Sequence, residues 1–389
     1  MSAINQDIPA QSVFSPLQPP RRYLFGPGPS MVDPRVYAAL SKPIVGHLDP
    51  YFIRVMGDIQ QLLKTAFGAD GSSTLVISGT GSAGMEAAVA NFVEPETKFA
   101  VFANGYFSDR MTEMAKRHNA QVVRFEKPWG ETFGDDEAAA FIRRERPNIV
   151  AYVQAETSTG AFQPGSAICA AAHEAGALVI ADCVTSLGGM AVDFDQTGID
   201  VAYSCTQKGL SCPPGLSPMA ISARATDWLR ARTSAVRSWY LDLRLIQDYS
   251  SVSHRYHHTA PISMFYALRE ALLVIEQEGI ENRWERHRRS HGTFVKGVEA
   301  MGLRMHVPVG QRIATLNTVC VPDGVDEGKV RKRLLDEVGI EIAGGFGPLA
   351  GKVFRIGVMG PLATEENVQF FLKEFGKALN AEGYSTGMQ

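Results

Sequence analysis

The sequence predicts an α/β fold in which a large, mostly parallel sheet is sandwiched by helices, followed by a smaller C-terminal α+β part. Two observations lead to this prediction. Many short segments are almost continuously apolar, as strands that are buried on both faces are. Between them lie stretches with the apolar spacing of amphipathic helices, and this alternation is typical of open parallel sheets. In such sheets ligands bind at the carboxyl ends of the strands.

The expected strands are the apolar runs at 74–79, 98–103, 121–125, 148–154, 178–182, 201–205 and 218–222. The expected helices between them are 83–92, 106–118, 135–145 and 165–175. After about residue 260 a long helical region follows, and Gly279 is expected to divide it into two helices. The remaining chain reads as strands at 314–322, 339–345 and 353–360 with helices near 325–338 and 364–380.

The length of 389 residues exceeds what one hydrophobic core usually organises. We therefore expect an N-terminal arm over 1–20, a large domain over 21–275 and a small C-terminal domain over 276–389. The formal net charge of -3 gives no indication of a nucleic acid or an anionic membrane as partner. No apolar stretch approaches the roughly 18 residues of a membrane span, and the first twenty residues lack a signal-peptide layout.

Five cysteines show neither a C-x-x-C pair nor a Cys/His metal pattern. We therefore expect no metal site, and a reducing compartment fits best, with the cytoplasm as the default.

A glycine-rich turn, SGTGSAGMEAA at 78–88, follows an expected strand and opens an expected helix. Its glycines let the backbone approach a ligand, and the N–H groups of the helix start can receive a phosphate. The hydroxyls of Thr80 and Ser82 could add hydrogen bonds. The motif is neither a Rossmann fingerprint nor a Walker A loop, and a turn of this kind is structural about as often as functional.

Two charged residues stand at the expected ends of buried strands. Asp182 ends 178–182, where an unpaired carboxylate is costly. A protonated pyridine nitrogen is one partner for it, and an Asp that only caps the next turn is the alternative. Lys208 follows seven uncharged residues. Most lysines are solvated, but one in a partly dry site has a lowered pKa and can form a Schiff base. A phosphate turn, an acid and such a lysine together indicate pyridoxal phosphate.

With these residues in view, the sequence resembles the class V, fold-type I aminotransferases, whose cofactor is pyridoxal phosphate. It is most similar to their alanine–glyoxylate and serine–glyoxylate (serine–pyruvate) group. The resemblance runs from residue 25 to residue 360, and the YHHT element is specific to this branch. The matching motifs occur in family order: FGPGPS, SGTGSAGMEAA, AETSTG, ADCVTSLGG, SCTQKGLSCPPG, WYLDL, RYHHTAP and the R-I-G of KVFRIGVMG.

The resemblance implies a role for each matching cofactor residue. Lys208 would form the internal aldimine and then shuttle the proton between the α-carbon and C4′, while Asp182 would pair with the pyridine nitrogen. Val184 would pack against the ring. The phosphate would be held by Thr80, Gly81, Ser82 and Gln207.

Two positions depart from the family pattern. Phe107 stands where the animal enzymes have a tryptophan that stacks on the ring, so the stack loses area and the indole N–H. Thr157 stands where the family has a serine that hydrogen-bonds the cofactor hydroxyl. Neither change removes the chemistry, but both could reshape the pocket.

The resemblance also implies how substrate and subunits are arranged. Arg355 would bind the substrate carboxylate through a bidentate pair, and Gly28 and Thr157 would line the substrate pocket. Tyr256 and Thr259 would reach the phosphate of a neighbouring subunit, which implies a homodimer with its active sites at the subunit interface.

The predicted reaction is a ping-pong transamination from alanine or serine to glyoxylate or pyruvate. Small donors are favoured because we identify no second arginine for a distal carboxylate, although Arg255 or a residue of a neighbouring subunit could serve. Pyridoxamine–pyruvate and aspartate–glyoxylate transamination stay open, because Phe107 and Thr157 reshape the pocket. A desulfurase would need a mobile cysteine, and Cys320 lies in an expected strand. A non-catalytic binding or scaffold protein would not need Asp182, Lys208 and Arg355 together.

Other polar residues are expected to be structural. At least one of His257 and His258 should be so, because adjacent side chains point in different directions. The basic segment 283–291 is expected to form a solvated helix face rather than an anion site.

Overall fold

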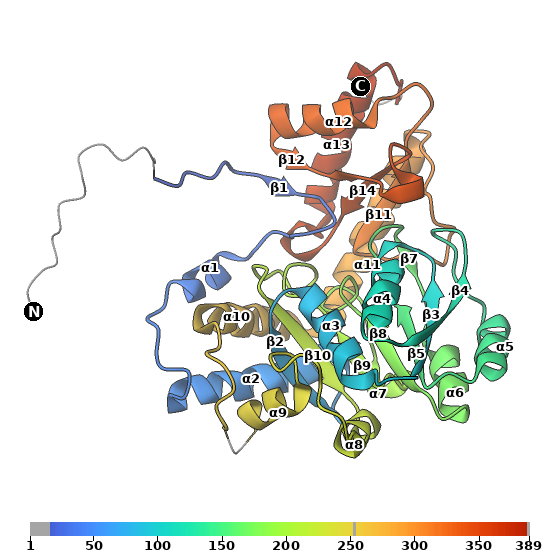
Figure 1. Cartoon of the computed structure of the whole chain (residues 1–389). Coiled ribbons are helices and arrows are strands. Elements are labelled where there is room, and N and C mark those ends of the chain that lie inside the picture. The colour runs from blue at the N-terminus through green and yellow to red at the C-terminus, as the bar shows by residue number, and fades with distance from the viewer. Residues whose placement is uncertain (1–15, 252–253, 387–389) are drawn as a thin grey trace, which may run out of the picture.

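The computed structural model describes residues 16–251 and 254–386 (Figure 1). Its central feature is a seven-stranded sheet in the order β2-β10-β9-β8-β5-β3-β4. Neighbouring strands are parallel except around β10, which runs antiparallel to both β2 and β9. The strands are β2 (Ser73–Ser78), β3 (Lys98–Ala103), β4 (Gln121–Glu126), β5 (Ile149–Val153), β8 (Leu178–Asp182), β9 (Val201–Tyr203) and β10 (Leu216–Ile221). The predicted mostly parallel sheet is confirmed.

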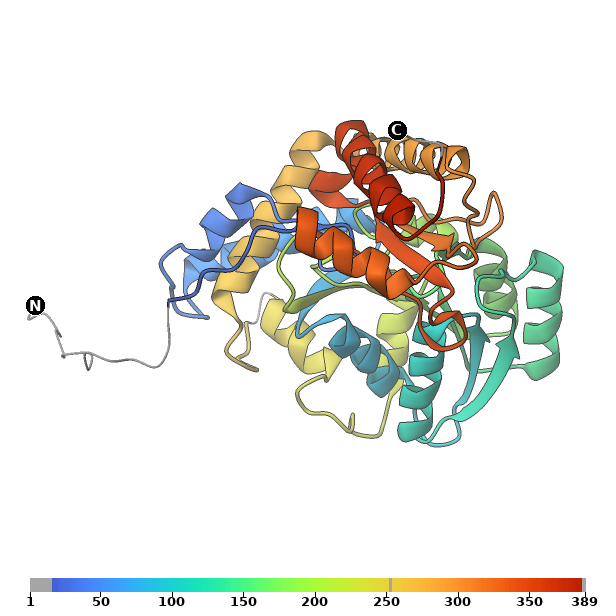
Figure 2. The same cartoon turned by 90° about the horizontal axis from the view of Figure 1, so that it is seen from above.

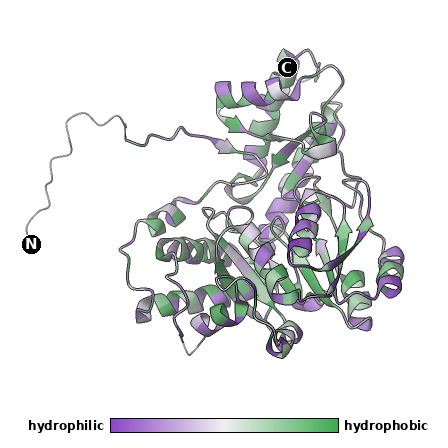
Figure 3. Cartoon of the chain, in the orientation of Figure 1, coloured by the Kyte–Doolittle hydropathy of each residue, from purple (hydrophilic) through white to green (hydrophobic). Residues whose placement is uncertain are grey.

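Helices cover both faces of this sheet because successive strand residues point to opposite sides. In β5, Val150 and Tyr152 belong to one hydrophobic core, whereas Ile149 and Ala151 belong to the other. Figure 3 shows these strands mainly in the green of apolar residues. The helices of this part are α1 (Pro34–Leu40), α2 (Pro50–Phe67), α3 (Gly81–Phe92), α4 (Tyr106–Arg117), α5 (Asp135–Glu145), α6 (Ser166–Glu174), α7 (Phe194–Thr197), α8 (Ala223–Ala231), α9 (Leu243–Ser250) and α10 (Ile262–Glu278).

The C-terminal part has its own core around a three-stranded antiparallel sheet of order β11-β14-β13. Figures 1 and 2 show this part on one side of the large sheet, with β1 (Tyr23–Leu24) beside β12 (Ile340–Glu341). Its other elements are α11 (Ile280–Ala300), β11 (Leu316–Cys320), α12 (Glu327–Arg333), a π-helical turn (Leu334–Val338), β13 (Ala343–Gly344), 3-10 turns at Gly347–Leu349 and Gly360–Leu362, β14 (Val353–Gly357) and α13 (Glu365–Ala381). A small hairpin, β6 (Ala155–Glu156) with β7 (Ala161–Phe162), follows β5.

Most expected elements are present, with informative exceptions. Gly279, at φ +82°, separates α10 from α11 as predicted. Strand β9 ends at Tyr203, two residues early, and the following residues form the turn that carries Lys208. Helices α1, α2, α7, α8 and α9 were not expected. The predicted division into an arm and two domains stays a prediction, and its boundary at 275/276 falls near the end of α10.

The prediction of a solvated face for 283–291 is wrong for three of its residues. Arg283, His287 and Ser290 are buried on the inner side of α11. Arg283 forms an ion pair with Glu278 and donates to the carbonyls of Gly188 and Gly209, each at 2.8 Å. Arg283 therefore connects helix α11 to the loops around Lys208. Its partners include backbone carbonyls, and the amino-acid composition does not reveal such contacts. Among the described residues, no helix is long and apolar enough to cross a membrane.

Candidate active site

The site lies where β8 and β9 end side by side. The two strands are parallel, and Asp182 is paired in register with Tyr203. Lys208 follows five residues after Tyr203, so both charged groups meet at the carboxyl edge, as predicted. They line a cavity of about 140 Å³. Eight predicted site residues surround this cavity: Thr80, Gly81, Ser82, Phe107, Asp182, Val184, Gln207 and Lys208.

Lys208 is buried, and two threonine hydroxyls hold its amine. Its Nζ donates to Thr157 Oγ1 at 2.8 Å and to Thr185 Oγ1 at 3.0 Å. Burial lowers the pKa of Lys208 to about 8, because the ammonium ion loses its hydration. Ser30 fixes the backbone by donating from Oγ to the Lys208 carbonyl at 2.8 Å. The amine is thus partly neutral near neutral pH and held in one orientation.

Gly28 lies directly against the stem of Lys208. Its φ of +123° is rarely adopted by other residues. A Cβ there would lie only 3.3 Å from Lys208 Cγ. The structure therefore places this residue at the site.

Asp182 is buried with two hydrogen bonds. Its Oδ1 accepts from the Val184 N–H at 2.9 Å, and its Oδ2 accepts from the Tyr203 hydroxyl at 2.8 Å. Burial raises the pKa of Asp182 above its ordinary value, and these two donors, with nearby positive charge, oppose the rise. Each oxygen keeps a free lone pair, so the carboxylate can accept a further N–H from the cavity.

The glycine-rich turn lies on another wall of the cavity. Helix α3 begins at Gly81, and the first N–H groups of a helix have no acceptor within it. A Cβ at Gly81 would lie 3.0 Å from Cys205 Cβ, a tight contact that glycine avoids. Within the described chain, Gln207 Oε1 is buried without a hydrogen-bond partner. Rotating this amide by half a turn would put an N–H in the place of that oxygen, and the residue lines the cavity. Free donors gathered at one wall suit a phosphate group.

Phe107 lies near the start of α4, with its ring centroid 5.8 Å from Lys208 Nζ. A fully buried acid, Glu156, holds this helix start. Its Oε2 accepts from the Phe107 N–H at 3.2 Å, and its Oε1 accepts from the N–H and hydroxyl of Ser158. Burial raises the pKa of Glu156 to about 6. This acid therefore fixes the backbone of Phe107, whose ring borders the cavity.

Arg355 comes from β14 in the C-terminal part and meets the site at Thr157. Its Nε donates to the Gly344 carbonyl at 2.7 Å and its Nη1 to the Thr157 carbonyl at 3.3 Å. The guanidinium lies 3.9 Å from the centroid of the Phe346 ring. Burial lowers the pKa of Arg355 to about 10, still well above neutral pH. Thr157 thus contacts both the amine of Lys208 and the guanidinium of Arg355.

Tyr256 and Thr259 are not among the residues that line this cavity. Both are exposed, and their hydroxyl oxygens lie 3.5 Å apart. Their predicted contact with a neighbouring subunit stays a prediction. The adjacent histidines are held by structural hydrogen bonds, His258 to Ser78 Oγ at 2.6 Å and His257 to the Trp239 carbonyl at 3.2 Å.

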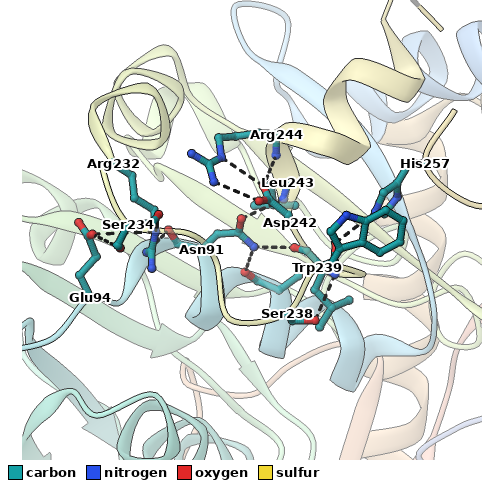
Figure 4. A network of polar contacts seen from close by, with 12 residues as sticks. Asn91, Glu94, Arg232, Ser234, Ser238, Trp239, Asp242, Leu243, Arg244 and His257 are labelled. Atoms are coloured by element: carbon teal, nitrogen blue, oxygen red, sulfur yellow. Dashed lines mark hydrogen bonds and ion pairs between the residues drawn. The ribbon is translucent and has the colours of Figure 1, made fainter. Parts of the chain in front are cut away.

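The WYLDL segment is fastened to α3 by Asn91 (Figure 4). The Asn91 side chain donates to the Leu241 carbonyl at 2.7 Å and accepts from the Leu243 N–H at 2.9 Å. Arg232 donates to the Asn91 carbonyl at 2.9 Å. This network connects the helix that opens with the glycine-rich turn to the chain that leads to the YHHT element.

Four residues of the site were missed by the sequence reading: Arg110, Glu156, Thr185 and Tyr203. Glu156 and Thr185 stand inside the motifs AETSTG and ADCVTSLGG, so a signal for these two residues is present in the sequence. Cys320 lies within β11, and burial raises the pKa of its thiol above its ordinary value. The described residues contain no group of three or more His, Cys, Asp or Glu side chains that could hold a metal ion.

Residues 22–371 match the family model described as aminotransferase class-V. The chain belongs to this family. It is therefore an aminotransferase, and its fold is that of the fold-type I enzymes, as predicted.

Among curated relatives, the chain is 38% identical to (S)-ureidoglycine–glyoxylate transaminase of Bacillus subtilis, over 93% of this chain and 94% of that protein. It is 35% identical to alanine–glyoxylate aminotransferase of Callithrix jacchus, over 95% and 91%. A solved alanine–glyoxylate aminotransferase of Nostoc sp. has a TM-score of 0.92 and 46% identity, over 94% and 97%. Pyridoxamine–pyruvate aminotransferase of Mesorhizobium loti is more distant, with a TM-score of 0.88 and 28% identity, over 92% of each chain.

Proposed function

We propose that this aminotransferase uses pyridoxal phosphate to move an amino group from alanine or serine to glyoxylate by a ping-pong mechanism. The observation that carries the proposal is the convergence of Lys208 and Arg355 on Thr157, beside Asp182. The relatives support glyoxylate over pyruvate as acceptor. Two bear names with different donors, ureidoglycine and alanine, but glyoxylate is common to both names.

The residues around the cavity fit pyridoxal phosphate. The glycine-rich turn offers free N–H groups to its phosphate, Asp182 offers an acceptor to its ring nitrogen, and Phe107 offers a ring face. When bound, the cofactor supplies an electron sink for the bond broken at the substrate α-carbon. The negative charge of Asp182 would keep the ring nitrogen protonated, and Lys208 would hold the aldehyde carbon.

The chain itself would bind the substrate and move one proton. Arg355 would hold the substrate carboxylate, which fixes the direction of the α-carbon relative to Lys208. The neutral amine of Lys208 would take the α-proton of the donor and give a proton back in the second half of the reaction. Thr157 and Thr185 would keep that amine directed while it is free.

The lowered pKa of Lys208 predicts how cofactor uptake depends on pH. Only the neutral amine attacks an aldehyde, and its fraction rises with pH until the pKa of about 8 is passed. The rate at which cofactor-free protein captures pyridoxal phosphate should therefore rise about tenfold per pH unit below 8 and level off above it. Stopped-flow absorbance measures this rate. A rate that keeps rising to pH 10 would indicate an ordinary, hydrated lysine.

Replacing Arg355 with glutamine is expected to raise KM for the amino donor about 30- to 100-fold, because two charge-assisted hydrogen bonds to the carboxylate are lost. Arg355→Lys keeps the positive charge but lacks the planar guanidinium that binds a carboxylate through two hydrogen bonds, so an intermediate KM is expected. Steady-state kinetics with alanine measures both. An unchanged KM in Arg355→Gln would show that the carboxylate of the amino donor binds to another residue.

We further propose a homodimer in which Tyr256 and Thr259 of one copy complete the phosphate site of the other. The exposure of both side chains supports this arrangement. Exposed large apolar side chains of the same chain also support it: Tyr37, Ile44, Leu48, Tyr51 and Trp239. Sedimentation of the purified protein tests the dimer. The five free cysteines support a reducing compartment such as the cytoplasm.

A donor screen with glyoxylate as acceptor tests the substrate assignment. Alanine and serine should give glycine with kcat/KM at least about tenfold above aspartate or pyridoxamine. A preference for (S)-ureidoglycine would support glyoxylate as the acceptor but contradict alanine and serine as the donors. Activity only with pyridoxamine and pyruvate would contradict both the proposed donor and the proposed acceptor, although the reaction would still be a transamination.

A further inference from the structure

Arg110 borders the same cavity as Lys208 and Asp182, yet the sequence reading gave it no role. It lies on α4, one turn after Phe107, and reaches across to the start of α3. Its Nη1 donates to Ser82 Oγ at 2.9 Å. Because the Ser82 oxygen accepts this bond, the hydroxyl proton of Ser82 is free to point elsewhere, including into the cavity. Arg110 is therefore joined to the glycine-rich turn at its hydroxyl side chain.

The guanidinium of Arg110 has no acidic partner. None of the ion pairs formed within 16–251 and 254–386 includes it. The neighbouring Asp109 is bonded to Arg124 instead, with 2.6 Å between Oδ1 and Nη2. The Arg110 guanidinium faces two aromatic rings, 5.2 Å from the centroid of Tyr106 and 4.9 Å from that of Phe107. A half-buried cation beside an anion-binding turn is thus left without a counter-charge.

We propose that Arg110 is a further cofactor-binding residue that neutralises the phosphate of pyridoxal phosphate and directs the Ser82 hydroxyl toward it. This inference rests on the proposed function. A phosphate monoester carries a charge between about -1.5 and -2 at neutral pH, whereas a helix start supplies only about half a positive charge. Of the residues around the cavity, Arg110 and Lys208 are the cations, and Lys208 would be occupied in holding the aldehyde carbon of the cofactor.

The test compares two forms of the cofactor that differ only in the phosphate. Cofactor-free full-length protein is titrated with pyridoxal phosphate and with pyridoxal, and binding is followed by absorbance. Arg110→Gln should weaken pyridoxal phosphate binding about 10- to 100-fold, the loss expected for a charge-assisted contact, and leave pyridoxal binding unchanged. Arg110→Lys, which keeps the charge, should recover part of the loss. Inorganic phosphate should compete with the cofactor in the wild type and less in Arg110→Gln.

The matched control is Arg117→Gln, a loss of the same charge at the other end of α4. Arg117 is exposed and paired with Glu113 at 2.9 Å, so both cofactor forms should bind as in the wild type. Equal weakening of both forms in Arg110→Gln would assign Arg110 only to the packing of Phe107 and overturn the inference. Unchanged binding of both would overturn it too. A wild-type protein that binds neither form would overturn the proposed function and this inference with it.

Discussion

Replacing Lys208 with alanine is expected to lower kcat by about 10⁴-fold, near the upper end of what a positioned acid–base group contributes. The reason is local. The amine is the group held between two hydroxyls at the carboxyl edge of the sheet, with its pKa lowered to about 8 by burial. Nothing else on the cavity wall combines a nucleophilic nitrogen with that position, since the other cation there, Arg110, carries a delocalised guanidinium that is a poor nucleophile.

Two further measurements separate a chemical role of Lys208 from a structural one. A small external amine that fits the space left by the side chain should restore part of the rate to Lys208→Ala. Borohydride reduction should attach the cofactor to the peptide that contains Lys208 in the wild type and to no peptide in the variant. Lys352→Ala, at an exposed lysine, is the control and should behave as the wild type. Covalent attachment at another lysine would contradict the assignment.

Replacing Asp182 with asparagine is expected to lower kcat by about 10²- to 10³-fold and to change KM little. The amide keeps an acceptor for the Val184 N–H but carries no negative charge. The ring nitrogen would then lose its proton more easily, which weakens the electron sink. The absorbance of the bound cofactor should therefore titrate at a lower pH in Asp182→Asn than in the wild type.

Asp200→Asn provides a matched control for this substitution. Asp200 is as buried as Asp182, but it precedes β9 and so lies at the opposite edge of the sheet, bonded to Arg224 at 2.9 Å. Its replacement should lower the melting temperature and leave kcat of the folded enzyme unchanged. If Asp182→Asn and Asp200→Asn lowered kcat equally, the loss would come from removing any buried acid. A specific role for the negative charge of Asp182 beside the cofactor would then be contradicted.

The meeting of Asp182 and Lys208 was predicted from the order of the strands and from the residue types at their ends. Asp182 and Lys208 each stand at the end of an apolar run, and consecutive parallel strands bring such ends to one edge of a sheet. The glycine-rich turn was visible as a motif, and at Gly81 the absence of a Cβ avoids a tight contact with Cys205. Apolar periodicity and residue type were sufficient for these inferences, whereas the roles of Phe107, Val184 and Gln207 were implied by the family resemblance.

The parts that were missed depend on contacts between distant segments. Thr185 and Tyr203 are ordinary residues of a buried strand end or turn, and their roles come from bonds to Lys208 and Asp182. Arg110 looked like one more cation on an amphipathic helix. Its position beside Ser82 depends on how α4 packs against α3, which no local pattern encodes. Arg283 was misread for the same reason, since its partners are carbonyls of two loops.

The absorption spectrum of the purified protein during a single half-reaction tests the central claim most directly. Saturation with pyridoxal phosphate should produce a visible band, and alanine without any acceptor should convert it to the band of the amine form while one pyruvate is released per site. Glyoxylate added afterwards should restore the first band and yield glycine. A protein that forms no such band with saturating cofactor, or forms it and releases no oxo acid with alanine, serine or any other donor tested, would contradict the account.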